Sequence, residues 1–141
     1  MAPLRGSGTL VRTMSLFDNE TQVATATAQD TPAGTTRFQG QVHPAWNIGA
    51  NPNGGYLLAL AAQALRQCTP GQPDPLSINV HYLRPGLAGQ PCQVDAQVLR
   101  SGRTISTVRA TLLQGGSPRL ELLAAMGNLG EAAAAPPVLA L

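Results

Sequence analysis

One segment of the chain, residues 56–68, constrains the fold more than any other because it is apolar around nearly its whole helical circumference. It reads YLLALAAQALRQC, and its first ten residues contain one polar side chain, Gln63. Asn53 stands ahead of the pair Gly54-Gly55 and is a favoured residue for capping a helix start, while the breaker at 69–71 ends the segment. A helix without a polar face is buried, so the sequence predicts a helix that other elements shield fully from water.

Strand patterns occupy most of the remaining chain. Four segments alternate apolar and polar side chains with the period of two that a half-buried strand requires. They are 76–83, 92–99, 103–113 and 118–126, and weaker strand candidates precede the helix at 21–29 and 35–42. In the third segment the alternation slips after Ile105, which predicts a bulge. The short joints indicate antiparallel neighbours, so the fold class is α+β, with an antiparallel sheet wrapped around one central apolar helix.

The 141 residues of the chain suit a single domain. Residues 1–19 are interpreted as a leader or extension, because Met14 opens a plausible second start, MSLFDNE. Residues 129–141 are rich in Ala and Pro and are interpreted as a tail or linker. The expected domain therefore covers 20–128.

Composition and charge exclude several classes of function. The net charge of +2 comes from nine Arg and no Lys against seven acidic residues, a surplus too small for an electrostatic nucleic-acid binder. No apolar run approaches the roughly 20 residues of a membrane span, so no membrane partner is expected. Two Cys without a CxxC pair suit a reducing, cytoplasmic location. Charged residues are 11% of the chain, well below the ordinary share of about 25%, which predicts a surface partly covered by a partner.

Three stretches of this sequence resemble the hotdog-fold thioesterase-like superfamily. The first is Trp46 followed by PNGGY at 52–56 and the Ala-rich helix, the second is HYLRPG at 81–86, and the third is VLRSGRT at 98–104. The sequence is most similar to the N-terminal half of two-hotdog acyl-CoA thioesterases of the thioesterase II type. The resemblance spans about 35–127, which is nearly all of the expected domain.

The resemblance implies a long sheet curled around the central helix and acyl-CoA thioesters as substrates, with no cofactor. It also implies an active site formed where two hotdog units meet. Two such units pair edge to edge, so we expect a homo-oligomer, a dimer or higher. Covered edges would account for the low share of charged residues.

In the context of this resemblance, the start of the helix is the expected catalytic centre. The backbone amides of Gly54, Gly55 and Tyr56 have no helical partners, and the helix dipole adds partial positive charge there. Such amides form an oxyanion hole for a thioester carbonyl, and Asn53 and Gln63 are expected to position water or the carbonyl. The alternative is that the two glycines only permit a tight turn and close packing.

The helix lacks the acidic residue that single-domain hotdog thioesterases carry about two turns beyond the glycine pair. That place falls at Ala62 or Gln63, and a carboxamide cannot act as a general base. In the two-hotdog family, the acid lies in the C-terminal half. An acyl-CoA thioester hydrolase remains the favoured function, and the alternative is a catalytically silent hotdog half that acts as an acyl-binding or dimerisation module.

Several side chains are candidates for holding the substrate. Trp46 and Tyr56 are expected to line an acyl tunnel, although packing residues would look the same in sequence. Arg84, Arg100 and Arg103 are expected to meet the phosphates of coenzyme A, with solvated strand-end arginines as the alternative.

Three other titratable residues offer weak alternatives. His43 lies in a loop ahead of the helix and is a weak candidate for a general base. His81 and Asp95 fall on polar strand faces and are expected to be solvated. Neither His has a second ligand at metal spacing, so zinc is not expected.

Overall fold

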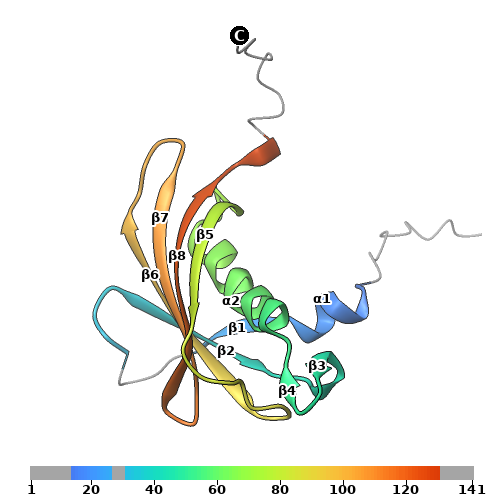
Figure 1. The fold of residues 1–141 in the computed structure, drawn as a ribbon. Coiled ribbons are helices and arrows are strands. Elements are labelled where there is room, and N and C mark those ends of the chain that lie inside the picture. Colours follow the sequence, from blue (N-terminus) through green and yellow to red (C-terminus); the bar gives the residue numbers. More distant parts are fainter. Residues whose placement is uncertain (1–13, 27–30, 131–141) are drawn as a thin grey trace, which may run out of the picture.

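The computed structural model describes residues 14–26 and 31–130, and it shows an antiparallel sheet curved around one long helix (Figure 1). The helices are α1 (Leu16–Glu20), the short 3-10 helix η1 (Pro44–Trp46) and α2 (Gly54–Cys68). The strands are β1 (Val23–Ala26), β2 (Thr35–Gln41), β3 (Asn47–Ile48), β4 (Asn51–Pro52), β5 (Asp74–Tyr82), β6 (Pro91–Arg100), β7 (Ser106–Gln114) and β8 (Ser117–Gly127). Within the two described ranges, no helix is long and apolar enough to cross a membrane.

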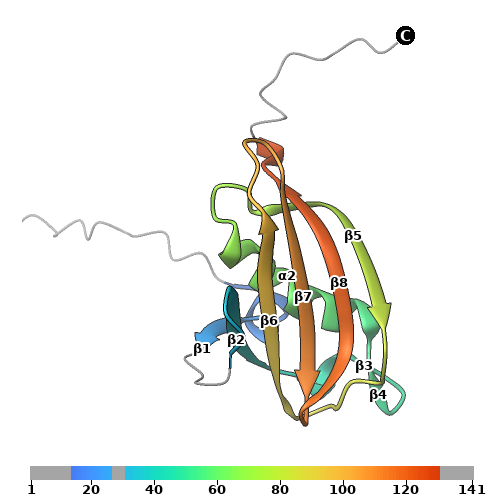
Figure 2. The ribbon, with the colours of Figure 1, turned by 90° about the vertical axis from the view of Figure 1, so that its left-hand side faces the viewer.

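Six strands form the main sheet in the order β1-β2-β6-β7-β8-β5, and every neighbouring pair is antiparallel. Figure 2 shows the sheet from its outer face, with α2 behind it. The tight turn from β7 to β8 uses Gly115 and Gly116, whose φ angles of +58° and +75° lie in the region that glycine adopts without strain. The order leaves β1 and β5 as the two edges of the sheet.

The expected α+β class is confirmed, because the four segments after the helix form β5 to β8 and the two weaker candidates form β1 and β2. The irregularity expected after Ile105 is present as a register shift in the β6–β7 pair, between Val98 and Arg100, which lie opposite Val108 and Thr107. Ile105 itself precedes β7 and is 44% exposed, and the inward positions alternate regularly from Ser106 to Leu112. A second register shift lies in the β7–β8 pair at Leu112/Leu113.

The long helix α2 lies against the concave face of the sheet (Figure 1). Its buried residues are Tyr56, Leu57, Leu60, Ala61, Ala64 and Leu65. The expectation that the helix is shielded on all sides is wrong, because the sheet curves around one side of it only. The other side carries a strip of exposed or partly exposed residues, here called the open strip: Gly55, Leu58, Ala59, Ala62 and Arg66.

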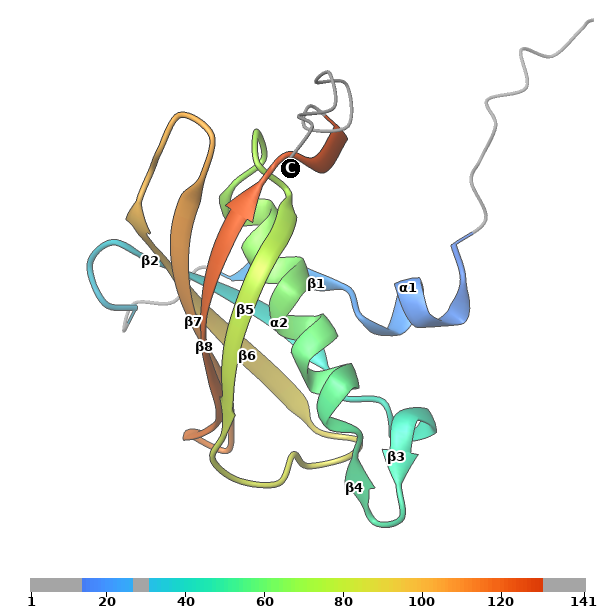
Figure 3. The same ribbon diagram turned by 45° about the horizontal axis from the view of Figure 1, so that its top comes forward.

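A small hairpin lies beside the start of α2 (Figure 3). It pairs β3 with β4 and follows η1, and it was not expected from the sequence. The amide of Asn53 donates a hydrogen bond of 2.9 Å to the carbonyl of Trp46, which closes the loop between η1 and α2. The hairpin thus fixes where α2 begins.

Candidate active site at the start of the central helix

The start of α2 from Asn53 to Tyr56, here called the glycine end, has the cap that the sequence predicts. Asn53 has extended backbone angles, and its side-chain oxygen accepts a 2.8 Å hydrogen bond from the amide of Gly55. The amides of Gly54 and Tyr56 have no hydrogen-bond partner among the described residues. Two backbone amides at this helix N-terminus therefore make no hydrogen bond to the described residues, and a third is bonded to the cap.

Tyr82, at the end of β5, covers one side of the glycine end. Its hydroxyl donates a 2.9 Å hydrogen bond to the carbonyl of Gly54. A Cβ atom at Gly54 would lie 3.1 Å from two carbons of the Tyr82 ring, so a larger residue here would push the ring away by a few tenths of an ångström. Partial burial raises the pKa of Tyr82, which keeps the hydroxyl protonated as a donor. No role for Tyr82 was expected from the sequence, although the residue stands in the HYLRPG stretch.

A small cavity of about 310 Å³ opens at the same place, between α2 and the segment that follows β5. Gly54, Leu57, Tyr82, Arg84 and Gly86 are among its lining residues. The Arg84 guanidinium donates a 2.9 Å hydrogen bond to the carbonyl of Pro118 and is otherwise exposed. The cavity therefore combines an apolar wall, a phenol and one cation beside the glycine end.

Trp46 and Tyr56 anchor the opposite side of the glycine end. Tyr56 is 3% exposed, and its hydroxyl donates to the carbonyl of Glu20 at 2.6 Å and accepts from the amide of His43 at 3.0 Å. Burial is the main cause that raises the pKa of Tyr56. The indole of Trp46 stacks on the Tyr56 ring at a centroid distance of 6.0 Å and remains partly exposed.

The other predicted site residues are spread over the molecule. Arg103 lines a cavity of about 340 Å³ at the C-terminal end of α2, together with Cys68. Arg100 ends β6 and is exposed. Within one chain, the structure therefore brings Arg84 to the glycine end, and it leaves Arg100 and Arg103 away from it.

Gln63 lies about two turns beyond the glycine end and is partly buried. Its side chain makes no hydrogen bond to the parts of the chain that the structure describes. The neighbouring Ala62 belongs to the open strip, so the place of the missing acid faces a partly uncovered side of α2.

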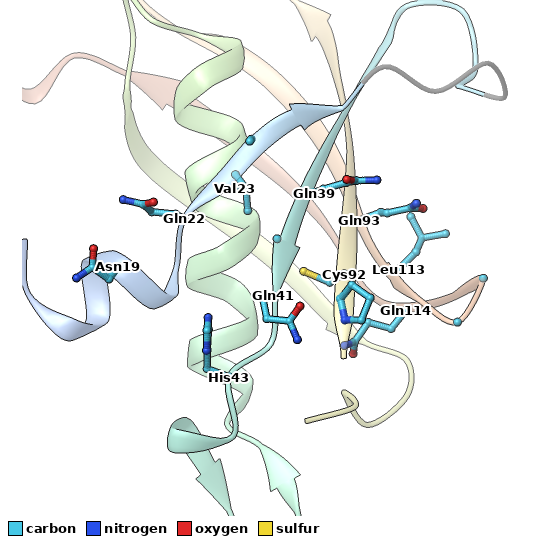
Figure 4. Close-up of a pocket in the computed structure, with 15 residues that line it drawn as sticks. Asn19, Gln22, Val23, Gln39, Gln41, His43, Cys92, Gln93, Leu113 and Gln114 are labelled. Atoms are coloured by element: carbon cyan, nitrogen blue, oxygen red, sulfur yellow. The ribbon is translucent and has the colours of Figure 1, made fainter. Parts of the chain in front are cut away.

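The remaining titratable candidates lie elsewhere. The imidazole of His43 borders a cavity of about 720 Å³, beside Gln41 and Cys92 (Figure 4). His81 is exposed on the outer face of the sheet. The expectation that Asp95 is solvated is wrong, because it forms two hydrogen bonds of 2.7 and 2.8 Å with Arg37 across the β2–β6 pair.

Comparison with known proteins places this geometry in a family. Over 71 residues, 49% of this chain, the sequence is 44% identical to the thioesterase-like protein TwmA of Talaromyces wortmannii, of which the match covers 20%. A candidate thioesterase II of Thermobifida fusca YX superposes with a TM-score of 0.74 at 29% identity, over 91% of this chain and 44% of that chain. The chain thus corresponds to less than half of the length of either protein.

Two shorter proteins share the fold at lower identity. The Escherichia coli PaaI protein from the phenylacetic acid degradation operon matches with a TM-score of 0.67 at 19% identity, covering 79% of this chain and 87% of that chain. The Streptococcus mutans protein smu.793, solved bound to acetyl-CoA, matches with a TM-score of 0.63 at 19% identity, covering 86% of this chain and 95% of that chain. The fold is therefore the hotdog fold.

The family model that describes the acyl-CoA thioesterase N-terminal domain matches residues 42–128. This stretch runs from the end of β2 to the end of β8 and includes the whole glycine end. The chain belongs to the family of acyl-CoA thioesterase N-terminal domains.

Proposed function

We propose that the chain hydrolyses acyl-CoA thioesters and that the thioester carbonyl oxygen binds at the glycine end of α2. The observation that carries this proposal is the pair of unbonded amides, Gly54 and Tyr56, at the N-terminus of α2, which begins with two glycines. The cavity beside Tyr82 and Arg84 gives a ligand room next to Gly54. Membership in the thioesterase family supports the substrate class.

The proposed chemistry places the negative charge of the reaction at these amides. Water attacks the carbonyl carbon, the carbon–sulfur bond breaks, and the thiolate of coenzyme A leaves and takes up a proton. The oxygen that becomes negative in the tetrahedral intermediate accepts hydrogen bonds from the helix start, where each such donor contributes about 3 kcal/mol. The Gly55 amide joins this set when the Asn53 carboxamide turns away from it.

The attacking water needs a base that α2 does not carry. Gln63 is proposed to orient this water, and the base is proposed to come from a second hotdog unit that covers the open strip. In a homo-oligomer that unit is a second copy, and in a longer protein it is a second domain. The unpaired edge of β5, where Leu76 and Tyr82 are 44% and 50% exposed, suits this pairing.

Coenzyme A carries phosphates that an arginine recognises well. Arg84 is proposed as the contact made within the same chain, because it lines the cavity at the glycine end. Arg100 and Arg103 are proposed as phosphate contacts only across a pairing of two units, since they lie away from this end in one chain. Trp46 is proposed to border the acyl group.

A second function is favoured by one observation, the absence of any acid on α2. In this alternative the chain binds acyl-CoA or pairs with another hotdog unit, and it does not hydrolyse the thioester. The glycine end then serves as a binding site for the carbonyl alone.

One experiment separates the two functions. The purified chain is offered short, long and aromatic acyl-CoAs, free thiol is followed with a chromogenic disulfide, and binding is measured by calorimetry on the same samples. Thiol release that falls about 100-fold in Gly54→Val, with Gly71→Val as the matched control, supports hydrolysis at the glycine end. Binding without release supports the silent acyl-binding module. Neither binding nor release contradicts hydrolysis and acyl binding, and it leaves only the pairing role of that module.

A further inference from the structure

The short helix α1 lies outside the stretch 42–128 that the family model matches, yet it contacts both anchors of the glycine end. Its last residue, Glu20, supplies two acceptors. The carboxylate accepts from the indole nitrogen of Trp46 at 2.5 Å, and the main-chain carbonyl accepts from the Tyr56 hydroxyl at 2.6 Å. Hydrogen bonds to an ionised acceptor are roughly twice as strong as neutral ones, so the Trp46 contact is the stronger candidate anchor.

From these two anchors, the contacts lead directly to the glycine pair. The carbonyl of Trp46 accepts from the amide of Asn53 at 2.9 Å, and the carbonyl of Asn53 accepts from the amide of Leu57 at 3.1 Å. Tyr56 itself carries one of the unoccupied amides. Glu20 therefore holds Trp46, which lies just ahead of the β3–β4 hairpin, and Tyr56, which lies in the first turn of α2.

The contacts of α1 are concentrated at this place. The ring of Phe17 packs edge-on against Trp46 at a centroid distance of 5.1 Å and lies 6.4 Å from the Tyr56 ring. No residue of α1 is itself buried, and a five-residue helix is too short to be stable alone. A capping box between Ser15 and Asp18 stabilises its first turn. α1 thus contributes little to the core and makes its aromatic contacts with the anchors of the glycine end.

We propose that Glu20 is a positioning residue for the thioester site: through Trp46 and Tyr56 it holds the glycine end where its free amides meet the substrate carbonyl. This inference rests on the proposed function. A displacement of about 1 Å at a catalytic group costs up to roughly 100-fold in rate. Loss of the Glu20 contact that holds Trp46 is therefore expected to have a measurable effect on the rate, because Trp46 in turn holds Asn53 at the glycine end. Glu20 touches neither the substrate nor the reacting atoms in this proposal.

The kinetic test compares Glu20→Ala with Glu20→Gln. The Ala variant removes the side-chain acceptor and is expected to lower kcat for acyl-CoA hydrolysis about 10- to 100-fold, with KM within about threefold. The Gln variant keeps an oxygen at the same reach and is expected to retain at least roughly a third of kcat. Equal loss in both variants would mean that the carboxylate acts as the base, and this result overturns the positioning role.

The partner side of the contact gives a second test. Trp46→Phe removes the indole donor and is expected to lower kcat by about the same factor as Glu20→Ala. The double variant is then no slower than the slower single variant, since both remove one interaction. Additive losses overturn the proposal. Glu121→Ala, which breaks the exposed Arg109–Glu121 pair on the outer face, is the matched control and keeps the wild-type kcat.

Hydrogen exchange tests the anchor without any turnover. In Glu20→Ala the amides of Asn53 and Leu57 are expected to exchange about tenfold faster or more, while amides of β7 and β8 keep their rates. If the wild-type chain hydrolyses no acyl-CoA, the proposed function fails and this measurement still decides whether Glu20 holds the glycine end. Unchanged exchange at these two amides, or a uniform rise over the whole chain, overturns the inference.

Discussion

At the scale of single residues, the hydroxyl of Tyr82 is the contact beside the glycine end that is easiest to test. Tyr82→Phe keeps the ring over Gly54 and removes the 2.9 Å hydrogen bond to the Gly54 carbonyl. Because the residue is half exposed, water replaces part of this bond, and we expect a stability loss of about 0.5 kcal/mol and a fall in kcat of roughly three- to tenfold. Urea unfolding and steady-state thiol release measure the two effects.

The matched control for this variant is Tyr56→Phe. Tyr56 is 3% exposed, and its hydroxyl makes hydrogen bonds with Glu20 and His43. Loss of that hydroxyl leaves buried partners unpaired and costs about 1–3 kcal/mol. A Tyr82→Phe variant that loses as much stability as Tyr56→Phe would contradict the half-exposed geometry at Gly54.

Residue roles were predictable from the sequence where their causes are local. Asn53 directly precedes two glycines, and its cap on Gly55 was expected from that spacing alone. The Trp46–Glu20 contact joins residues 26 positions apart, and the Arg37–Asp95 pair joins residues 58 apart. Side chains so far apart in sequence meet through the tertiary fold: strand register brings Arg37 to Asp95, and the packing of α1 against η1 brings Glu20 to Trp46. Residue types do not reveal either arrangement.

At the scale of elements, the loop between β6 and β7 depends on a glycine that has no room for a side chain. A Cβ atom at Gly102 would lie 2.1 Å from the carbonyl oxygen of Ile105. The neighbour is backbone, so Gly102→Ala must move the loop, and we expect a loss of about 2 kcal/mol or more. Thermal and urea unfolding measure it. Gly71→Ala, where a Cβ would meet nothing within 4 Å, is the control that should stay within about 0.5 kcal/mol.

If both alanine variants unfold alike, the loop between β6 and β7 tolerates the shift and the steric argument fails. The side chain of Gln72 donates to the carbonyl of Gly102 at 3.0 Å, so a displaced loop also loses this contact with the end of α2. If the loop is displaced as expected, hydrogen exchange of the backbone amides near Ser106 rises in Gly102→Ala and stays unchanged in Gly71→Ala.

Long elements were easier to predict than short ones. The strands of the main sheet were predicted from the alternation of apolar and polar side chains, because a half-buried strand shows this alternation over its whole length. The helix α1 and the hairpin of β3 and β4 are too short to carry a period, and they form because their side chains and backbone contact α2 and its preceding loop. The apolar character of α2 predicted burial correctly for its sheet-facing side, and the open strip, with Leu58, Ala59 and Ala62 only partly exposed, is where that prediction went too far.

At the scale of the whole molecule, the open strip and the free edge of β5 both point to assembly. Partly exposed apolar side chains and an unpaired strand edge are each unfavourable in water, and Figure 1 shows the edge strand β5 beside α2. The homo-oligomer was expected from the charged fraction of 11% and from the edge-to-edge pairing that the family resemblance implies. The sequence indicates that a surface is covered, but only the strand order shows that β5, and not one of β6 to β8, is an edge.

Pairing through β5 predicts a mass of about twice 14.6 kDa by light scattering at micromolar concentration. In an antiparallel pair of two β5 edges, residues near the middle of the strand face their own copies, and like charges placed there repel. Asn79 is exposed near this middle, so Asn79→Lys is expected to weaken the assembly about tenfold or more, with a smaller effect at high salt. Gln39 is exposed on β2, far from this edge, so Gln39→Lys adds the same charge and should leave the mass unchanged.

A wild-type mass near 14.6 kDa, or equal dissociation of the assembly in both variants, would show that β5 does not pair the copies. The first of these results would also remove a second copy as the source of the missing base.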